Sequence, residues 1–293
     1  MFTRAVVVGA CGEVGRLVSQ SLGNSGIRVT GVDVRSETSA KFSVFFQESA
    51  AAPSAELLTH LARTEALFVC LPEGVGLASA PLMLSTLCDG ALWVDTFSVK
   101  APVAKLLETQ RKRLQICSIN PMFAPGLGWA GKPVAAVALT AGERVDFLQE
   151  LLVSWGAKLE MLGVEEHDRA TAALQVATHA AALAFGTALC ELGYDTHAAV
   201  KLATPPHRLL VALLYRIVSQ NPEVYWDIQR NHPAGAATRA ALREGLRHLD
   251  ENVARDDKAE FAKGFAAIRE VLHAEDSIIG QWSLGAIEQV MRS

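Results

Sequence analysis

Two short segments place polar residues and turn-forming residues directly after apolar runs. They are Asp95-Thr96-Phe97-Ser98-Val99-Lys100 and Asn120-Pro121-Met122-Phe123-Ala124-Pro125. The apolar runs before them, 91–95 and 114–119, are typical of buried strands, and loops after such strands carry the chemistry of α/β proteins. Asn120 is the unusual member, because an amide can orient a substrate by hydrogen bonding but cannot take its proton.

A glycine-rich turn follows another apolar run, 5–8, and precedes a helical pattern that continues to Leu22. Glycines let the backbone approach a pyrophosphate, and the first turn of a helix offers free N–H groups to it. A glycine turn without a ligand is the alternative. The cofactor-binding residues that we expect in this turn are Gly9, Cys11, Gly12, Glu13, Val14 and Gly15.

The next predicted strand, 28–32, ends in Asp33, about twenty residues after the glycine turn. A carboxylate there binds the ribose hydroxyls and repels a 2′-phosphate, so Asp33 favours NAD over NADP; Arg35 weakens that preference. A solvated carboxylate at a strand end is the alternative. Leu71 and Pro72 break a further strand where the ribose and nicotinamide of a cofactor would pass.

Strands alternate with helical stretches through the first half of the chain, which predicts a Rossmann-type, doubly wound and mostly parallel sheet. The second half shows helical patterns only. We therefore predict an NAD-binding domain over 1–164 and an all-helical substrate-binding and dimerisation domain over 165–293. The predicted helices cover 166–192, 196–202, 206–219, 223–230, 236–255 and 259–293.

Composition excludes several classes of partner. The 293 residues carry a net charge of −4 with scattered basic residues, which disfavours nucleic acid or a membrane surface. Five cysteines without paired spacing indicate reduced, mostly buried thiols and no metal site. The N-terminus passes directly into a strand, so we expect a cytoplasmic protein. The apolar stretch 170–189 contains several polar residues and favours a buried helix over a membrane span.

One predicted helix carries polar residues at helical spacing: His167, Thr171, Gln175 and the pair Thr178/His179. Because its other faces are apolar, this stripe is expected to face a wet cleft. The alternatives are that His167 is exposed at the start of the helix and that His179 is a hydrogen-bonded core residue.

Two arginines follow on a later helix. Arg208 and Arg216 are separated by about 12 Å of helix rise, so they are not expected to bind one carboxylate together. Arg216 is surrounded in sequence by Leu, Ile and Val and needs an anionic partner. That partner is either a ligand or a structural salt bridge.

These motifs, in this order, resemble the prephenate/arogenate dehydrogenase family across nearly the whole chain. The resemblance implies that a nicotinamide accepts hydride from ring C4 while the ring carboxylate leaves as CO2. In the family, a histidine that opens His-Pro-Met-Phe-Gly-Pro takes the proton of the C4 hydroxyl. A matching serine, Ser98, supports it, and Arg216 matches the arginine that binds the ring carboxylate. His179 and Tyr225 match residues of the pocket.

The chain departs from that pattern where the family keeps its base, because Asn120 replaces the histidine and Ala124 replaces a glycine. A 4-hydroxyl needs a base, whereas the lone pair of a 4-amino group can drive hydride loss unaided. We therefore expect NAD-dependent oxidation of a dicarboxylate, 4-amino-4-deoxyprephenate, to 4-aminophenylpyruvate in specialised-metabolite (p-aminophenylalanine) biosynthesis. The expected catalytic residues are Asn120 and Ser98, and Ser98 is also expected to bind the cofactor. The expected substrate-binding residues are Arg216, His179, Gln175, Arg208 and Tyr225.

Three alternatives stay open. A prephenate or arogenate dehydrogenase of tyrosine biosynthesis could use another base, such as His179, since Asn before Pro is also a common turn pair. An NAD-binding sensor could have lost catalysis. A β-hydroxyacid dehydrogenase or imine reductase shares the layout, but the former needs a lysine on the first helix of the second half, and 165–200 contains none.

Overall fold

The computed structural model describes residues 1–36, 42–272 and 278–292. The chain forms two compact units. The first contains Met1–Thr171 together with Arg230–Pro233, and the second contains Ala172–Gln229 and Ala234–Ser293. The domain boundary expected at residue 164 stays a prediction.

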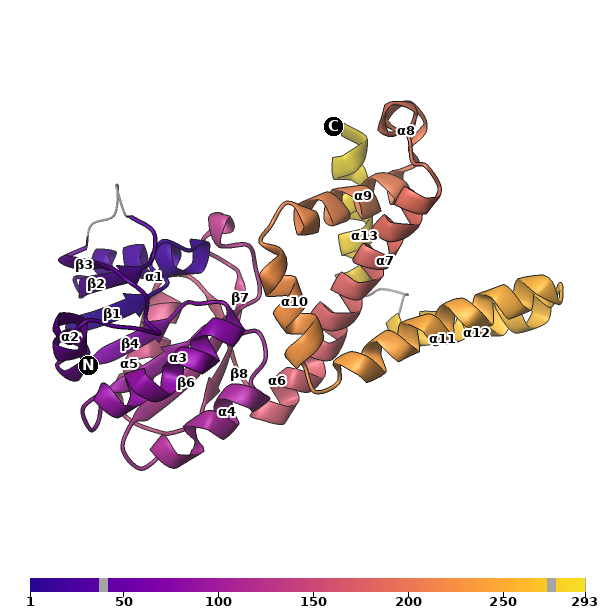
Figure 1. Ribbon diagram of the computed structural model, residues 1–293. Helices are drawn as coiled ribbons and strands as arrows, with labels where there is room; N and C mark the ends of the chain where they lie inside the picture. The colour runs from indigo at the N-terminus through magenta and orange to yellow at the C-terminus, as the bar shows by residue number, and fades with distance from the viewer. Residues whose placement is uncertain (37–41, 273–277, 293) are drawn as a thin grey trace. The chain divides into compact units, whose positions relative to one another are not determined.

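An eight-stranded sheet in the order β3-β2-β1-β4-β5-β6-β7-β8 forms the centre of the first unit (Figure 1). Neighbouring strands are parallel except for β6 and β7, so the prediction of a mostly parallel sheet is confirmed. The edge strand β3 was not expected from the sequence. The strands are β1 (Arg4–Val8), β2 (Arg28–Asp33), β3 (Val44–Gln47), β4 (Ala66–Val69), β5 (Leu92–Asp95), β6 (Gln115–Pro121), β7 (Pro133–Ala138) and β8 (Lys158–Met161).

Alternate residues of the central strands enter two separate cores. In β1, Ala5 and Val7 pack on one face of the sheet with α1 (Glu13–Asn24) and α5 (Glu143–Ser154), whereas Val6 and Val8 pack on the other face. The helices on that second face are α2 (Ala55–Ala62), α3 (Glu73–Thr86) and α4 (Ala101–Leu107). Strands buried on both faces explain why the sequence runs here are continuously apolar.

All described elements of the second unit are helical (Figure 1). The C-terminal region expected as one helix from 259 onward contains two, and residues 273–277 of that stretch lie outside the described residues. The helices are α7 (Thr178–Glu191), α8 (Thr196–Leu202), α9 (Pro205–Val218), α10 (Pro222–Asn231), α11 (Gly235–Ala254), α12 (Lys258–Leu272) and α13 (Ile278–Arg292).

The helix expected to be buried is largely exposed in the single chain. α6 (Val164–Thr171), a π-helical segment (Ala172–Ala177) and α7 continue one another, and only 11% of the most apolar window of Val164–Glu191 is buried. Its length and mean hydropathy of 1.4 would suit a membrane span, but one such helix is weak evidence for that. The expectation of burial is wrong for the single chain because its described helices leave this surface uncovered.

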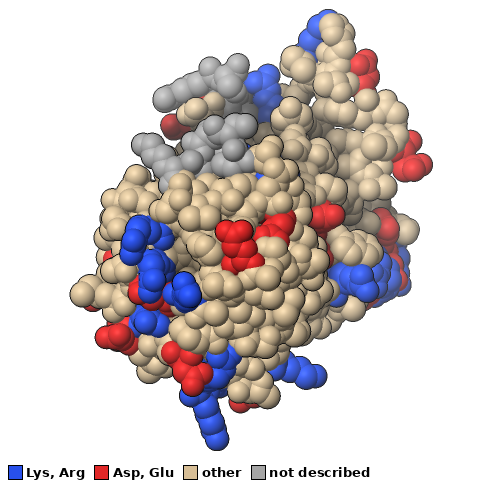
Figure 2. Space-filling model, turned by 60° about the vertical axis from the view of Figure 1, so that its left-hand side comes forward, with Lys and Arg blue, Asp and Glu red and all other residues tan. Residues whose placement is uncertain are grey.

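Charged side chains of both signs are interspersed on the face of the molecule drawn in Figure 2. The cysteines are free thiols, as predicted, but only Cys11 and Cys117 are buried, while Cys88 and Cys190 are exposed. The expectation that most thiols are buried is therefore wrong. Surface cysteines on helix ends and loops cannot be distinguished from core cysteines by spacing alone.

Candidate active site

The glycine turn of the first unit is closely packed at the carboxyl end of β1. Gly9 has φ +80°, and a Cβ added to it would lie 2.3 Å from the Cys70 carbonyl oxygen. A Cβ added to Gly15 would lie 2.0 Å from the Gly9 carbonyl oxygen. These contacts bring α1 against the strand and leave its N-terminus, which Gly12 precedes, facing the carboxyl edge of the sheet.

Asp33 is tied to this turn. Its Oδ2 accepts a hydrogen bond from the Cys11 backbone N–H at 2.9 Å, and its Oδ1 accepts from the backbone and Nε of Arg35 at 3.0 and 3.1 Å. Burial opposes ionisation of Asp33, but these hydrogen bonds and the Arg35 charge together hold its pKa below the usual value. The carboxylate is therefore ionised and fixed beside the turn.

Asn120 lies near the carboxyl end of β6 and is buried, with 2% of its surface exposed. Its amide Nδ2 lies 3.2 Å from Nε2 of His167, which is itself fully buried on α6. The alternative that His167 is exposed at the start of its helix is wrong. The structure thus places an imidazole against the amide that stands in the expected catalytic position.

The other ring nitrogen of His167, Nδ1, lies 2.8 Å from Oδ1 of Asp168. The same carboxylate accepts hydrogen bonds from the backbone N–H groups of Lys100 and Ala101, each at 2.8 Å. Asp168 therefore caps the start of α4 from a distant part of the sequence, where the helix dipole favours a negative charge. These bonds outweigh the effect of burial and lower the pKa of Asp168.

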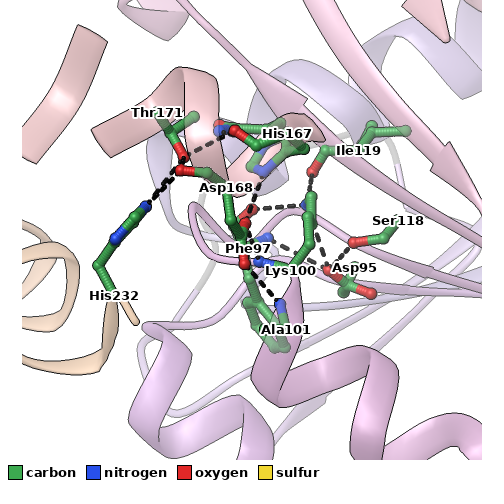
Figure 3. Close-up of polar contacts among 11 residues, drawn as sticks. Asp95, Phe97, Lys100, Ala101, Ser118, Ile119, His167, Asp168, Thr171 and His232 are labelled. Atoms are coloured by element: carbon green, nitrogen blue, oxygen red, sulfur yellow. Dashed lines mark hydrogen bonds and ion pairs between the residues drawn. The ribbon is translucent and has the colours of Figure 1, made fainter. Parts of the chain in front are cut away.

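Lys100 is a buried ammonium group that contacts the loop after β5 and the end of β6 (Figure 3). Its Nζ donates to the carbonyl oxygens of Phe97 at 2.6 Å and Ile119 at 2.8 Å, and it lies 3.6 Å from the Asp95 carboxylate. Burial lowers the pKa of Lys100, and the negative charge of Asp95 opposes that shift. Asp95 also accepts a hydrogen bond from Ser118.

His232 and Thr171 complete the network on the far side of α6 (Figure 3). Nε2 of His232 lies 2.9 Å from the Asp168 carbonyl oxygen and 3.3 Å from Oγ1 of Thr171. Thr171 Oγ1 donates in turn to the His167 carbonyl oxygen at 3.0 Å. His232, directly after α10, thus fixes the helix that carries His167.

The second unit brings together several predicted substrate-binding residues. The rings of His179 and Tyr225 meet edge to face with centroids 4.8 Å apart, and Gln175 lies one helical turn before His179. Buried polar atoms of Gln175 (Oε1) and His179 (Nδ1) have no hydrogen-bond partner among the described residues. Burial, followed by the Arg216 charge, lowers the pKa of His179, so this imidazole is neutral. At Nδ1, His179 therefore differs from the hydrogen-bonded core histidine that was the alternative interpretation of the sequence.

Arg216 differs from the expectation of a guanidinium that packs among apolar side chains. It is exposed, and so are Leu213 (36%) and Val218 (59%) on α9, although Ile217 directly beside it is buried. Arg208, half-buried, lies two turns earlier on the same helix. Because the two arginines lie eight residues apart on α9, they do not bind one carboxylate together, as expected from the sequence.

Ser98, Leu71 and Pro72 were also expected to lie at the site. Ser98 is half-buried, and no hydrogen bond joins it to Asn120 among the described residues. Leu71 and Pro72 follow β4 at the edge that also carries the glycine turn, as the sequence predicts. Within the described residues, no group of three or more His, Cys, Asp or Glu side chains could hold a metal ion.

Sequence reasoning did not assign roles to Asp95, Lys100, Asp168 or His232. The signal for Lys100 was its position five residues after a strand-end aspartate, since a buried lysine needs an anionic neighbour. Asp168 follows His167 directly, but its partners are backbone groups 67 and 68 residues earlier in the chain. No local pattern encodes such a contact.

Comparisons with known proteins agree with this architecture. Residues 163–267 match the model of the prephenate dehydrogenase dimerization domain. The chain is 42% identical over 272 residues to the 4-amino-4-deoxyprephenate dehydrogenase of Streptomyces pristinaespiralis, covering 93% of this chain and 92% of the relative.

Solved structures share the fold. Prephenate dehydrogenase from A. aeolicus, solved in complex with hydroxyphenyl propionate and NAD+, has a TM-score of 0.73 at 18% identity and covers 94% of this chain and 99% of its own. Synechocystis arogenate dehydrogenase has a TM-score of 0.64 at 17% identity and covers 92% of this chain and 99% of its own. The identity to the Streptomyces relative over nearly the full length shows that the chain belongs to the prephenate dehydrogenase family of oxidoreductases.

Proposed function

We propose that this protein oxidises 4-amino-4-deoxyprephenate with NAD+ to 4-aminophenylpyruvate and CO2. The observation that carries the proposal is Asn120, a buried amide at the strand-end position where the family pattern has its catalytic histidine. The Streptomyces relative with 42% identity, named as 4-amino-4-deoxyprephenate dehydrogenase, supports the same substrate.

The reaction balances without a protein base. The C4–H bond breaks as hydride leaves, and the amine lone pair forms a C=N bond that carries the positive charge. The bond between the ring and its carboxylate then breaks, CO2 departs, and the bonding pair makes the ring aromatic while it returns the lone pair to nitrogen. A hydroxyl would need to lose a proton for the same push, which is the work of an imidazole in this position.

The surroundings of Asn120 fit this division of labour. An amide neither gains nor loses a proton at working pH, so Asn120 can hold the nitrogen but cannot deprotonate a hydroxyl. Nε2 of His167, the ring nitrogen that faces it, is occupied by the amide hydrogen bond. The group on ring C4 is thus oriented by a neutral amide.

The glycine turn and Asp33 of the first unit fit NAD+, which accepts the hydride when bound. Gly9 and Gly15 leave no room for side chains, so the backbone and the start of α1 are available to a pyrophosphate. Asp33, ionised beside the turn, would accept hydrogen bonds from the ribose hydroxyls and repel a 2′-phosphate.

Roles in the second unit follow from its chemistry. Arg216 is available to a carboxylate, and Gln175, His179 and Tyr225 supply polar and aromatic contacts. Exposed apolar residues of Val164–Glu191 and of α12 favour a homodimer, in line with the matched dimerization domain. A dimeric, cytoplasmic enzyme acting on a small dicarboxylate is the form that we propose.

Purified enzyme, NAD+ and each of three dienyl acids test the proposal by NADH formation. The acids are 4-amino-4-deoxyprephenate, prephenate and arogenate. We expect the highest kcat/KM with the 4-amino acid. Prephenate or arogenate turning over at least as well would assign the enzyme to tyrosine biosynthesis, and tight NAD+ binding without turnover of any acid would indicate a sensor.

A further inference from the structure

The direction of the Asn120 amide is fixed by a chain of hydrogen bonds. Asp168 is an anion that accepts two backbone N–H bonds, so its Oδ1 can only accept from His167. Nδ1 of His167 therefore carries the proton. In a neutral imidazole the other nitrogen, Nε2, is then an acceptor without a proton.

An acceptor at Nε2 determines which end of the amide faces it. Asn120 must present its NH2 group, and Nδ2 does lie at 3.2 Å from that nitrogen. The amide oxygen, Oδ1, consequently faces away from His167. No described residue donates a hydrogen bond to it.

We infer that His167 and Asp168 act as positioning residues that offer Asn120 Oδ1, and not Nδ2, to the group on the reacting carbon. The identity of that group rests on the proposed function. The arrangement makes the site an acceptor for N–H at ring C4.

An acceptor there discriminates between the two substrate types as charge develops. The amino substrate gains positive charge on a nitrogen that keeps its N–H bonds, and Oδ1 stabilises it. A hydroxyl that has lost its proton becomes a carbonyl oxygen, which would meet Oδ1 lone pair to lone pair. A reversed amide would have the opposite preference, so the direction of one side chain sets the specificity.

Nuclear magnetic resonance of protein labelled with 15N in histidine tests the first step without any substrate. The pattern of coupling between ring protons and ring nitrogens distinguishes a protonated Nδ1 from a protonated Nε2. We expect His167, assigned by its absence in His167→Phe, to carry its proton on Nδ1. A proton on Nε2 of neutral His167 would overturn the inference whatever the substrate is.

Kinetics with the 4-amino acid and prephenate test the second step. His167→Phe keeps a planar ring but removes the hydrogen-bond acceptor, so the Asn120 amide is free to turn. We expect kcat for 4-amino-4-deoxyprephenate to fall about tenfold or more, with a smaller fall for prephenate. His167→Gln, whose side-chain oxygen can accept from Nδ2, should restore most of the loss. His60→Phe, the same substitution on α2, is the matched control and should change neither rate.

Equal losses with both substrates in His167→Phe, without rescue by glutamine, would reduce His167 to a structural role and overturn the inference. Failure of the proposed function looks different. In that case the wild-type enzyme would not prefer 4-amino-4-deoxyprephenate to prephenate, while His167 would still carry its proton on Nδ1.

Discussion

Nζ of Lys100 donates a hydrogen bond to the carbonyl oxygen of Ile119 at 2.8 Å. Ile119 is the residue directly before Asn120, so a buried ammonium group holds the strand end that presents the amide. The same nitrogen donates to Phe97 and lies 3.6 Å from Asp95. One side chain thus joins the loop after β5 to the end of β6.

Lys100→Met removes this junction with little change in volume. Asp95 would keep its buried charge without its cation, and two carbonyl oxygens would lose a donor. We expect the free energy of unfolding to fall by about 3–5 kcal/mol, measured by urea denaturation. Lys105→Met, on the exposed side of α4, is the control and should have little effect. A loss below about 1 kcal/mol would mean that the ammonium group contributes little.

The stability of the protein should depend on pH through His167. Burial lowers the pKa of His167 from 6.5, with Lys100 and His232 adding to the shift and Asp168 opposing it. The unfolded chain therefore binds a proton at a higher pH than the folded chain. Stability from this group is complete above pH 6.5 and is lost as the pH falls below that value towards the folded pKa.

Urea denaturation of wild type and His167→Phe between neutral pH and mildly acidic pH measures this contribution. The wild type should lose stability more steeply, by up to about 1.4 kcal/mol per pH unit for one proton. His179, whose pKa is also lowered, contributes to both proteins and cancels in the difference. Parallel curves would show that His167 does not titrate differently on folding.

Asn120→His should move the enzyme towards prephenate. A histidine that donates one N–H to Nε2 of His167 keeps its other nitrogen as a base for the C4 hydroxyl. We expect the ratio of kcat/KM for prephenate to that for the 4-amino acid to rise at least about tenfold. Asn120→Ala, which removes the amide without adding a base, should lower activity with no such gain, and an unchanged ratio in Asn120→His would contradict the proposed mechanism.

Two glycines of α1 should respond oppositely to alanine. In Gly15→Ala the new methyl group would lie 2.0 Å from the Gly9 carbonyl oxygen, so helix and strand must separate. We expect a loss of at least about 2 kcal/mol of stability together with weakened NAD+ binding. Gly23→Ala, in the same helix with no described atom from outside the helix backbone within 4 Å of the added Cβ, should gain about 0.5–1 kcal/mol. Thermal unfolding and NAD+ titration compare the two, and similar outcomes would contradict the close packing.

Asp33→Asn should weaken the preference for NAD+ over NADP+. The substitution removes the charge that repels a 2′-phosphate and frees Arg35 from its 3.1 Å ion pair. We expect the NAD+/NADP+ ratio of kcat/KM to fall about tenfold, measured at saturating dienyl acid. A constant ratio would mean that Asp33 supports only the turn at Cys11.

The sheet could be predicted from the sequence because its rules are local. The apolar runs 5–8 and 28–32 and the glycine turn between them specify strand, turn and helix without knowledge of distant contacts. β3 (Val44–Gln47) escaped prediction, since a four-residue edge strand carries too little pattern to stand out from a loop.

The site was only partly predictable. Motif order identified Asn120, but the burial of His167 depends on a carboxylate that caps α4 from 67 residues away. A histidine between acidic residues looks exposed when only the local sequence is considered. Arg216 shows the reverse error: its apolar neighbours in sequence indicated burial, yet only Ile217 among them is buried and Arg216 itself is exposed.

The first unit is assembled from a discontinuous chain, since Arg230–Pro233 rejoins it after a long excursion. An exchange of residues 1–164 alone therefore replaces only part of the first unit, because residues 165–171 and 230–233 keep the recipient's sequence. A chimaera that takes only residues 1–164 from a relative would inherit a new residue at position 120 while keeping the recipient's imidazole and carboxylate behind it. A change of residue at position 120 is therefore tied to positions 167 and 168, which such an exchange leaves untouched.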